Sequence, residues 1–401
     1  MYDRKIVPFL RMKKMDKHKI STMLLLLIAC IFCVFLYWLN TEKLGSYKLL
    51  QADNLQYEKA TITNVIDQYL EADAQTSSGY RGTQEVQVKV NSGKLKNKEF
   101  TITNHVTKTH NILVEKGSKI IVAVDENQAG NSVSIYNYQR TSGLSIMIGL
   151  FVVLMIAVGG FKGVKATIGL TFTLVTVLFF TLPLIFHGYA PILIALLSAI
   201  IISGFTLLII DGPTKKTLVA FVGTACGLVI AGCIFTIFSS ILHVSGFQLE
   251  EVETMFVIAN QTGLHIRDVL FAGVLIAAVG ALLDVAMSIA STLHEIYEVN
   301  PNLRAYQLFQ SGMHVGRDMI GTMSNTLILA YAGSSFATMI LFMAYSVNAN
   351  QILNMDYIAL EISQALAGSI GIVLTVPFTS LLGAYILTTK AKGSKKQTVQ
   401  S

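Results

Sequence analysis

The stretch Gly280–Thr326, GALLDVAMSIASTLHEIYEVNPNLRAYQLFQSGMHVGRDMIGTMSNT, places polar residues between two long apolar segments. Its first half carries four polar residues at i, i+4, i+7 and i+11, one stripe of a helix: Asp284, Ser288, Ser291 and Glu295. Its second half repeats i, i+4, i+7 with Asp318, Thr322 and Asn325. A carboxylate inside an apolar helix costs roughly 2.5–3.5 kcal/mol on insertion scales. Asp284 therefore predicts a functional site that faces a bundle interior or a water-filled cavity.

The composition indicates a multi-pass membrane protein with one soluble insert. Of 401 residues, 53% are hydrophobic and only 13% are charged, against roughly 25% charged in soluble domains. The net charge of +6 lies mainly at the two ends of the chain, so it bears on topology and not on nucleic acid. All four cysteines fall in predicted spans, so we expect no disulfide framework in the insert: Cys30, Cys33, Cys226 and Cys233.

The N-terminal region predicts an uncleaved signal anchor. Residues 1–19 are basic, and residues 20–40 form an apolar run of about 20 residues, which is long enough to span a bilayer. No small-x-small cleavage site follows it. The run Leu27–Cys30 resembles a lipoprotein cleavage box, but the chain stays apolar through Trp38, so lipidation is the disfavoured alternative.

Residues 42–141 differ in character, because charges are frequent and nearly balanced there. Apolar and polar residues alternate in five runs: 60–65, 84–90, 99–103, 119–124 and 132–136. Five short strands predict a small β-rich domain, with an OB-like barrel as its specific form. Aromatic residues are too few to stack bases, which argues against nucleic-acid binding. A docking or assembly role is favoured over a small-ligand site.

Residues 143–388 predict a seven-helix transmembrane domain, with spans at about 143–160, 166–186, 190–210, 217–242, 269–291, 321–345 and 362–387. With the anchor, the chain is an α-helical polytopic membrane protein of about eight transmembrane helices. A cytoplasmic N-terminus puts the basic connections inside: Lys162, Lys165, Lys215, Lys216, Arg304 and Arg317. Both termini, including the basic tail 389–401, are then cytoplasmic, and residues 42–141 are extracytoplasmic.

Two motifs carry a family resemblance. The segment LLDVAMSIAS at 282–291, followed by GRDMIGTMSNTLILAYAG at 316–333, resembles the YibE/F family of bacterial membrane proteins. The anchor and the β-rich insert resemble the longer, YibE-like type. The resemblance implies a bacterial plasma-membrane protein whose partner is a shorter, YibF-like chain or a second copy, besides the lipid bilayer. It supplies no substrate and no catalytic residue.

The chemistry of the stripes favours a secondary transporter or permease for an ion or small polar solute. Hydroxyl and amide groups suit hard cations, a proton relay or polar solutes: Ser288, Ser291, Thr322, Ser324 and Asn325. Glu295 lies near the inner mouth, and Arg317 with Asp318 forms a candidate gate pair. The alternative for the hydroxyls is helix packing, and for Arg317 and Asp318 a charge pair at the membrane edge.

Other functions have weaker signals. A non-transporting assembly or envelope-biogenesis factor, acting through residues 42–141, is the main alternative. An enzyme is disfavoured, because the sequence has no Gly-x-Gly-Asp motif, and His294-Glu295 lacks a second His four residues on. No Walker or dinucleotide-binding motif is present. We therefore expect no catalytic residue, no metal site and no cofactor.

Overall fold

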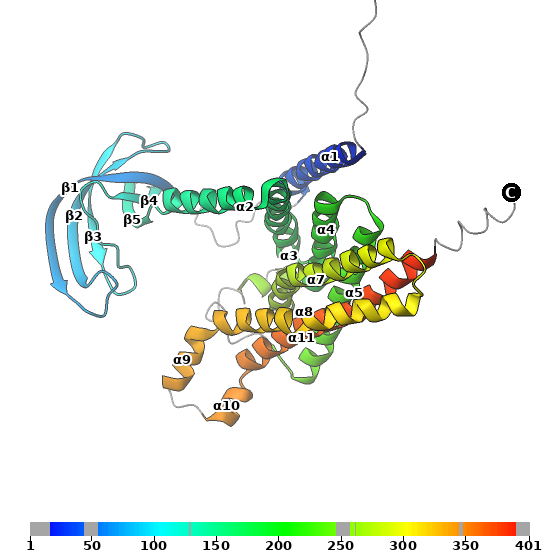
Figure 1. The fold of residues 1–401 in the computed structure, drawn as a ribbon. Coiled ribbons are helices and arrows are strands. Elements are labelled where there is room, and N and C mark those ends of the chain that lie inside the picture. The colour runs from blue at the N-terminus through cyan, green and yellow to red at the C-terminus, as the bar shows by residue number, and fades with distance from the viewer. Residues whose placement is uncertain are drawn as a thin grey trace, which may run out of the picture. The chain divides into compact units, whose positions relative to one another are not determined.

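A computed structural model describes residues 17–43, 55–127, 130–245, 257–260, 262–344 and 348–389 (Figure 1). The chain divides into two compact units, Tyr47–Ala157 and the remainder. The first unit is built on β-strands and the second on helices, and each is described by itself.

The β unit contains one five-stranded antiparallel sheet, so the five predicted strands are confirmed. The strands are β1 (Leu55–Ala72), β2 (Tyr80–Val90), β3 (Glu99–Val106), β4 (Lys119–Asn127) and β5 (Gly130–Tyr138). Their order in the sheet is β3-β2-β1-β4-β5, and the edge strands β3 and β5 also contact each other. Register shifts at Ile62/Asn64 and Val65/Asp67 bend the long β1. The sheet therefore curls into a half-barrel around its apolar face.

The core of this half-barrel follows the period-two alternation of the strands. Alternate side chains of β1, β2 and β4 are buried: Ala60, Ile62, Val86, Val88, Val90, Ile120, Val122 and Val124. Burial raises the pKa of the Tyr138 phenol, whose hydroxyl donates to the Leu113 carbonyl. The inward side chains of the sheet and the connection 107–118 thus close one apolar core.

Two buried amides attach the connection 107–118 to the sheet. Gln84 Nε2 donates to Val114 O at 3.0 Å, and Val114 N donates back to Gln84 Oε1 at 3.1 Å. Asn104 Nδ2 donates to Ile112 O at 2.7 Å. Because buried polar groups are normally paired, these bonds compensate for two amides inside an apolar core and hold Ile112 and Val114 over its end.

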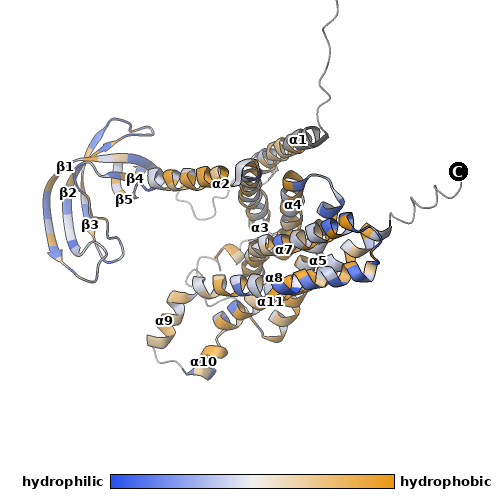
Figure 2. Cartoon of the chain, in the orientation of Figure 1, coloured by the Kyte–Doolittle hydropathy of each residue, from blue (hydrophilic) through white to orange (hydrophobic). Residues whose placement is uncertain are grey.

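The helical unit begins with α1 (Lys17–Trp38) and a π-helical turn (Leu39–Lys43). Its other elements are α2 (Thr141–Thr176, begun in the β unit), the π-helical Val177–Thr181, α3 (Leu182–Phe186), α4 (Pro191–Asp211), α5 (Lys215–Ile241), α7 (Ile266–Val299), α8 (Ala305–Ser334), α9 (Phe336–Ala344), α10 (Ala349–Leu353) and α11 (Asp356–Thr389). Figure 2 shows apolar residues along α2 and α4 and hydrophilic ones near the joined ends of α7 and α8.

Five helices of the described chain are long and apolar enough to cross a membrane, or six if the bent pair α8–α9 is one span. These helices suggest membrane insertion. Two predicted spans, 143–160 and 166–186, fall in one helical run, Thr141–Phe186. Gly160 interrupts that run with φ 54° and ψ −134°, a conformation that glycine adopts without strain. The predicted span 321–345 crosses a bend of 56° between α8 and α9.

The bundle is organised around α7 and α11. The helix α11 packs against α5, α7 and α8, and α7 also packs against α4 and α5. Buried α7 residues recur at helical spacing, as in Leu282, Ile289 and Leu293. The rings of Phe235 and Phe271 stack with centroids 3.7 Å apart between α5 and α7. Apolar side chains of one face of each helix thus form a common core.

The connections gather at two opposite ends of the bundle. At one end Lys165 Nζ donates to Ile210 O at 2.9 Å, which joins α2 to the last turn of α4. At the other end Ser245 Oγ, just after α5, donates to Asp356 Oδ2 at 2.6 Å at the start of α11. Successive long helices from α4 onward therefore run in alternating directions, as spans of a membrane domain do.

Candidate functional site

The predicted polar residues lie on a hairpin of two helices, α7 and α8, which contact each other (Figure 1). The turn between them is closed by Asn302 N, which donates to Asn300 Oδ1 at 3.2 Å, and by Arg304 N, which donates to Gln307 Oε1 at 3.0 Å. Asp284 lies near the middle of α7, and Thr322 is almost equally far from the turn on α8. The two residues therefore lie at similar depth in the bundle.

One face of α7 is left open by the bundle. Gly273, Ala277, Gly280 and Asp284 follow each other at helical spacing, and all four are exposed. A Cβ added at Gly273 or Gly280 would meet no atom of the described residues within 4 Å. Toward the turn, Ser288 and Ser291 are half-buried and Glu295 is exposed. The predicted stripe thus lies along an outer edge of the helical unit and not within its apolar core.

One face of α8 is also open. Exposed residues on it are Arg317, Asp318, Gly321, Thr322 and Asn325. The opposite face of α8 packs on α11 through Gly312, Gly316 and Leu327. Ser324 is half-buried, and its hydroxyl has no hydrogen-bond partner among the described residues. We define the open α7–α8 face as the exposed residues of Gly273–Asp284 on α7 and Arg317–Asn325 on α8.

Two hydroxyls on or beside this face donate to carbonyls of their own helices. Thr322 Oγ1 donates to Met319 O at 3.0 Å, and Thr292 Oγ1 donates to Ser288 O at 2.9 Å. Across residues 262–344 and 348–389, no hydrogen bond or ion pair reaches the Asp284 carboxylate. Nor does an ion pair join Arg317 to Asp318 in the same ranges. The face therefore presents unsatisfied polar groups beside small residues, an arrangement open to water, a solute or another helix.

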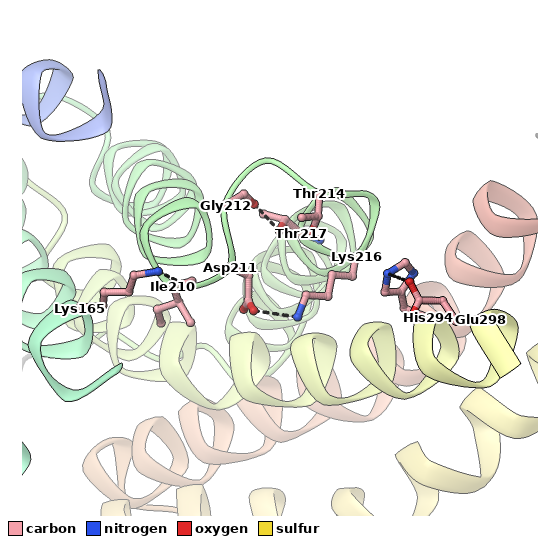
Figure 3. Close-up of polar contacts among 9 residues, drawn as sticks. All are labelled: Lys165, Ile210, Asp211, Gly212, Thr214, Lys216, Thr217, His294 and Glu298. Atoms are coloured by element: carbon pink, nitrogen blue, oxygen red, sulfur yellow. Dashed lines mark hydrogen bonds and ion pairs between the residues drawn. The ribbon is translucent and has the colours of Figure 1, made fainter. Parts of the chain in front are cut away.

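The end of the bundle at which α4 passes into α5 holds a separate polar cluster, drawn in Figure 3. Lys216 Nζ pairs with Asp211 Oδ1 at 2.7 Å across the turn from α4 to α5. Thr217 Oγ1 donates to Gly212 O at 2.6 Å, and the Thr214 hydroxyl accepts from Thr217 N at the start of α5. These bonds neutralise a partly buried charge and cap a helix, so they stabilise the turn.

The His294-Glu295 pair singled out in the sequence lies near the end of α7. His294 Nε2 lies 3.2 Å from Glu298 Oε1, one turn along α7 (Figure 3), while Glu295 is exposed. Among the described residues, no group of three or more His, Cys, Asp or Glu side chains is arranged to hold a metal ion. His294 thus makes a pair at the surface of its own helix.

A second group of polar residues was missed by sequence reasoning. Ser335 at the end of α8 accepts a hydrogen bond from Tyr357 at the start of α11, and Tyr331 and Glu361 lie one helical turn away on the same two helices. Glu361 directly precedes the predicted span 362–387. No second carboxylate lies at helical spacing from it within that span, so the sequence around Glu361 did not indicate a site. Its partners come from another helix, and only tertiary structure brings them together.

The β unit has an open cleft of about 730 Å³ where β1 and β3 end and β2 begins. Residues lining it include Tyr69, Arg81, His105 and Lys108. Arg81 also pairs with Glu71 at 3.3 Å, although both side chains are largely exposed. The cleft therefore offers mixed aromatic and charged chemistry, suited to either a docking role or a small ligand.

Comparison with known proteins identifies the helical part of the chain. A family model described as YibE/F-like protein matches residues 147–389, which is more than half of the sequence. The chain belongs to the YibE/F-like family. The matched region contains the whole α7–α8 hairpin and α11, while α1 and the five strands lie outside it. No curated protein and no solved structure matches this YibE/F-like chain.

Proposed function

We propose that this YibE/F-like protein is a secondary transporter or permease for an ion or small polar solute. The open α7–α8 face would line its path, with Asp284 and Asn325 as the central polar groups. The observation that carries the proposal is Asp284 itself, a carboxylate in mid-helix that is exposed from the bundle and that no described residue pairs.

The physical argument concerns what covers Asp284 in a membrane. Facing lipid, the carboxylate would cost roughly 2.5–3.5 kcal/mol on insertion scales. The glycines beside it leave room for water or solute, because no side chain of the described residues fills the space next to Gly273 and Gly280. A polar path along this face compensates for the carboxylate and uses the hydroxyls and amide of α8. Glu295 then marks the inner mouth, and Arg317 with Asp318 the inner gate.

The topology proposed for this path has eight spans in the bacterial plasma membrane. Both termini are cytoplasmic, and the β unit lies outside. Support comes from the end of the bundle at which Lys165 and Lys216 lie together with the α4–α5 turn, since Lys and Arg favour the cytoplasmic side. Gly160 supports a division of the run Thr141–Phe186 into two spans.

A partner is part of the proposal, because a path needs a second wall. The open α7–α8 face carries small residues at helical spacing, which allow close helix approach. A second copy of this chain or a shorter member of the YibE/F-like family would supply that wall. The proposal requires neither a nucleic acid nor a cofactor, and no catalytic step.

The test is complementation of a deletion strain, scored as sensitivity to ions and polar solutes. Asp284→Asn keeps the size of the side chain and removes its charge, so we expect normal membrane levels and loss of complementation. The matched control is Asp268→Asn on the same helix, where Asp268 pairs with Arg267 at 3.1 Å. Full complementation by Asp284→Asn at wild-type membrane levels would contradict the transport proposal.

The second candidate is a non-transporting assembly or envelope-biogenesis factor. The cleft of the β unit favours it, since Arg81, His105 and Lys108 line a surface suited to a protein partner. This function predicts that removal of residues 42–141 abolishes complementation while Asp284→Asn has little effect. The two variants in one strain therefore distinguish the two candidates.

A further inference from the structure

Four oxygen-bearing side chains meet where α8 ends. Tyr331 and Ser335 come from the end of α8, and Tyr357 and Glu361 come from the first turns of α11. Tyr357 Oη donates to Ser335 Oγ at 3.0 Å. Glu361 lies one helical turn after Tyr357 on α11, and Tyr331 lies one turn before Ser335 on α8. Ser335 is only 2% exposed, so this contact is inside the protein.

Two oxygens of the cluster lack partners. Glu361 Oε2 and Tyr331 Oη are both buried without a hydrogen bond from any described residue. Helical spacing places both groups beside the contact between Tyr357 and Ser335. The ion pairs of the described chain do not include Glu361, and the nearest carboxylate on α11, Asp356, accepts from Ser245 Oγ. A buried carboxylate of this kind requires a positive charge or a proton to compensate it.

The backbone adds to the negative charge at this point. The helix α8 ends at Ser334, and α9 leaves at an angle of 56°. The carbonyl end of a helix carries a partial negative charge, and the ends of broken helices in membrane proteins are where cations are held. The bend between α8 and α9 thus places a helix C-terminus, a carboxylate and an unpartnered phenol in the same place.

We propose that this cluster, defined as Tyr331, Ser335, Tyr357 and Glu361, is a binding site for a hard monovalent cation of the sodium class. Oxygen is the ligand that hard cations prefer, and every donor here is oxygen. A single carboxylate matches a single positive charge. Glu361 Oε2 and Tyr331 Oη supply the free ligand positions, and the cation would link α8 to α11 at the bend.

The site is distinct from the open α7–α8 face and deepens the proposed transport function by naming a candidate coupling ion. It rests on that function only for its coupling role. Binding itself is measured on purified protein without any flux, so a failure of the cation site and a failure of transport are separate results.

The experiment measures thermal unfolding of the detergent-solubilised full chain in sodium, potassium or choline chloride at equal ionic strength. A cation that binds only the folded protein raises the unfolding temperature with its concentration. We expect sodium to raise it over choline in the wild type. Glu361→Gln removes the charge, so it should weaken apparent sodium affinity at least about tenfold, since loss of a charged ligand of this kind is worth at least about 1.4 kcal/mol.

Two further variants keep the test informative. Tyr331→Phe removes one free oxygen and no charge, so it should weaken sodium affinity even if Glu361→Gln does not fold. Glu298→Gln, at an exposed carboxylate of α7, should retain the full sodium effect. An equal unfolding temperature in all three salts for the wild type would overturn the proposal. So would stabilisation by low pH alone that Glu361→Gln abolishes, because it would assign a proton and not a cation to Glu361.

Discussion

The contact between α5 and α11, here called the α5–α11 seam, and the open α7–α8 face both contain glycines and polar residues, but these residues have different surroundings in the two regions. In the seam, Gly223 lies against Thr379 and Gly227 lies against Thr375, so a side chain of the neighbouring helix fills the space beside each glycine. On the open face, Gly273 and Gly280 precede Asp284 at helical spacing, but no atom of the described residues lies within 4 Å of the position of a Cβ. Glycine and hydroxyl groups at helical spacing therefore do not by themselves distinguish tight packing from a site.

What separates the two regions is the presence of a partner surface. The seam is closed by protein, and its hydroxyls are buried beside glycine backbones. The open face has a carboxylate, Asp284, that packing within the bundle would leave uncompensated. A charged residue in the middle of a helix, next to small residues that no neighbouring helix contacts, therefore indicates a path or an interface. Small residues next to neutral hydroxyls indicate helix packing.

The largest expected effect is in the seam. A Cβ at Gly227 would overlap Thr375 Oγ1 and come within 2.7 Å of Leu282 Cδ2. Gly227→Val should therefore lower the free energy of unfolding by at least about 3 kcal/mol, since overpacking between rigid helices leaves no room to relax. Chemical unfolding in detergent measures the change.

The matched control is Gly280→Val on the open face, where the new side chain meets open space. We expect its free energy of unfolding to stay within about 1 kcal/mol of the wild type. Similar losses of stability in Gly227→Val and Gly280→Val would mean that both regions are closed by packing, and the contrast between them would be lost.

The smallest expected effect concerns an unpartnered hydroxyl of the seam. Thr379 is fully buried, and its Oγ1 has no hydrogen bond among the described residues. Thr379→Val keeps the shape and removes only this hydroxyl, so the free energy of unfolding should change by less than about 0.5 kcal/mol or rise. A loss above about 1.5 kcal/mol would show that Thr379 binds a partner or water, and the seam would no longer be a purely packed region.

Much of this architecture follows from sequence patterns. Alternation of polar and apolar residues is enough to locate the strands, because one face of a curled sheet must be buried. Long apolar runs locate the helices, and the spacing from Asp284 to Glu295 places these residues on one stripe. Local periodicity decides such features, and no knowledge of the partner helix is needed.

Other features depend on contacts between distant segments. The spacing of polar residues along α8 predicts one polar side of the helix but does not show what covers that side. In the structure that side lies outside the core. The surroundings of Glu361 depend on Tyr331 and Ser335, which lie on another helix. The break at Gly160 depends on a single backbone conformation that no periodicity encodes. Tertiary packing decides all three.

The most direct test of the open α7–α8 face is its access to water. Single cysteines would replace Gly280 or Asn325 in a chain whose four native cysteines are removed, and a charged, membrane-impermeant thiol reagent would be added to intact membranes. The control position is Val229, which is exposed near the middle of α5 and lies on an apolar helix. A polar path predicts reaction at Gly280 and Asn325 and none at Val229. Equal protection at all three positions would contradict a path along this face.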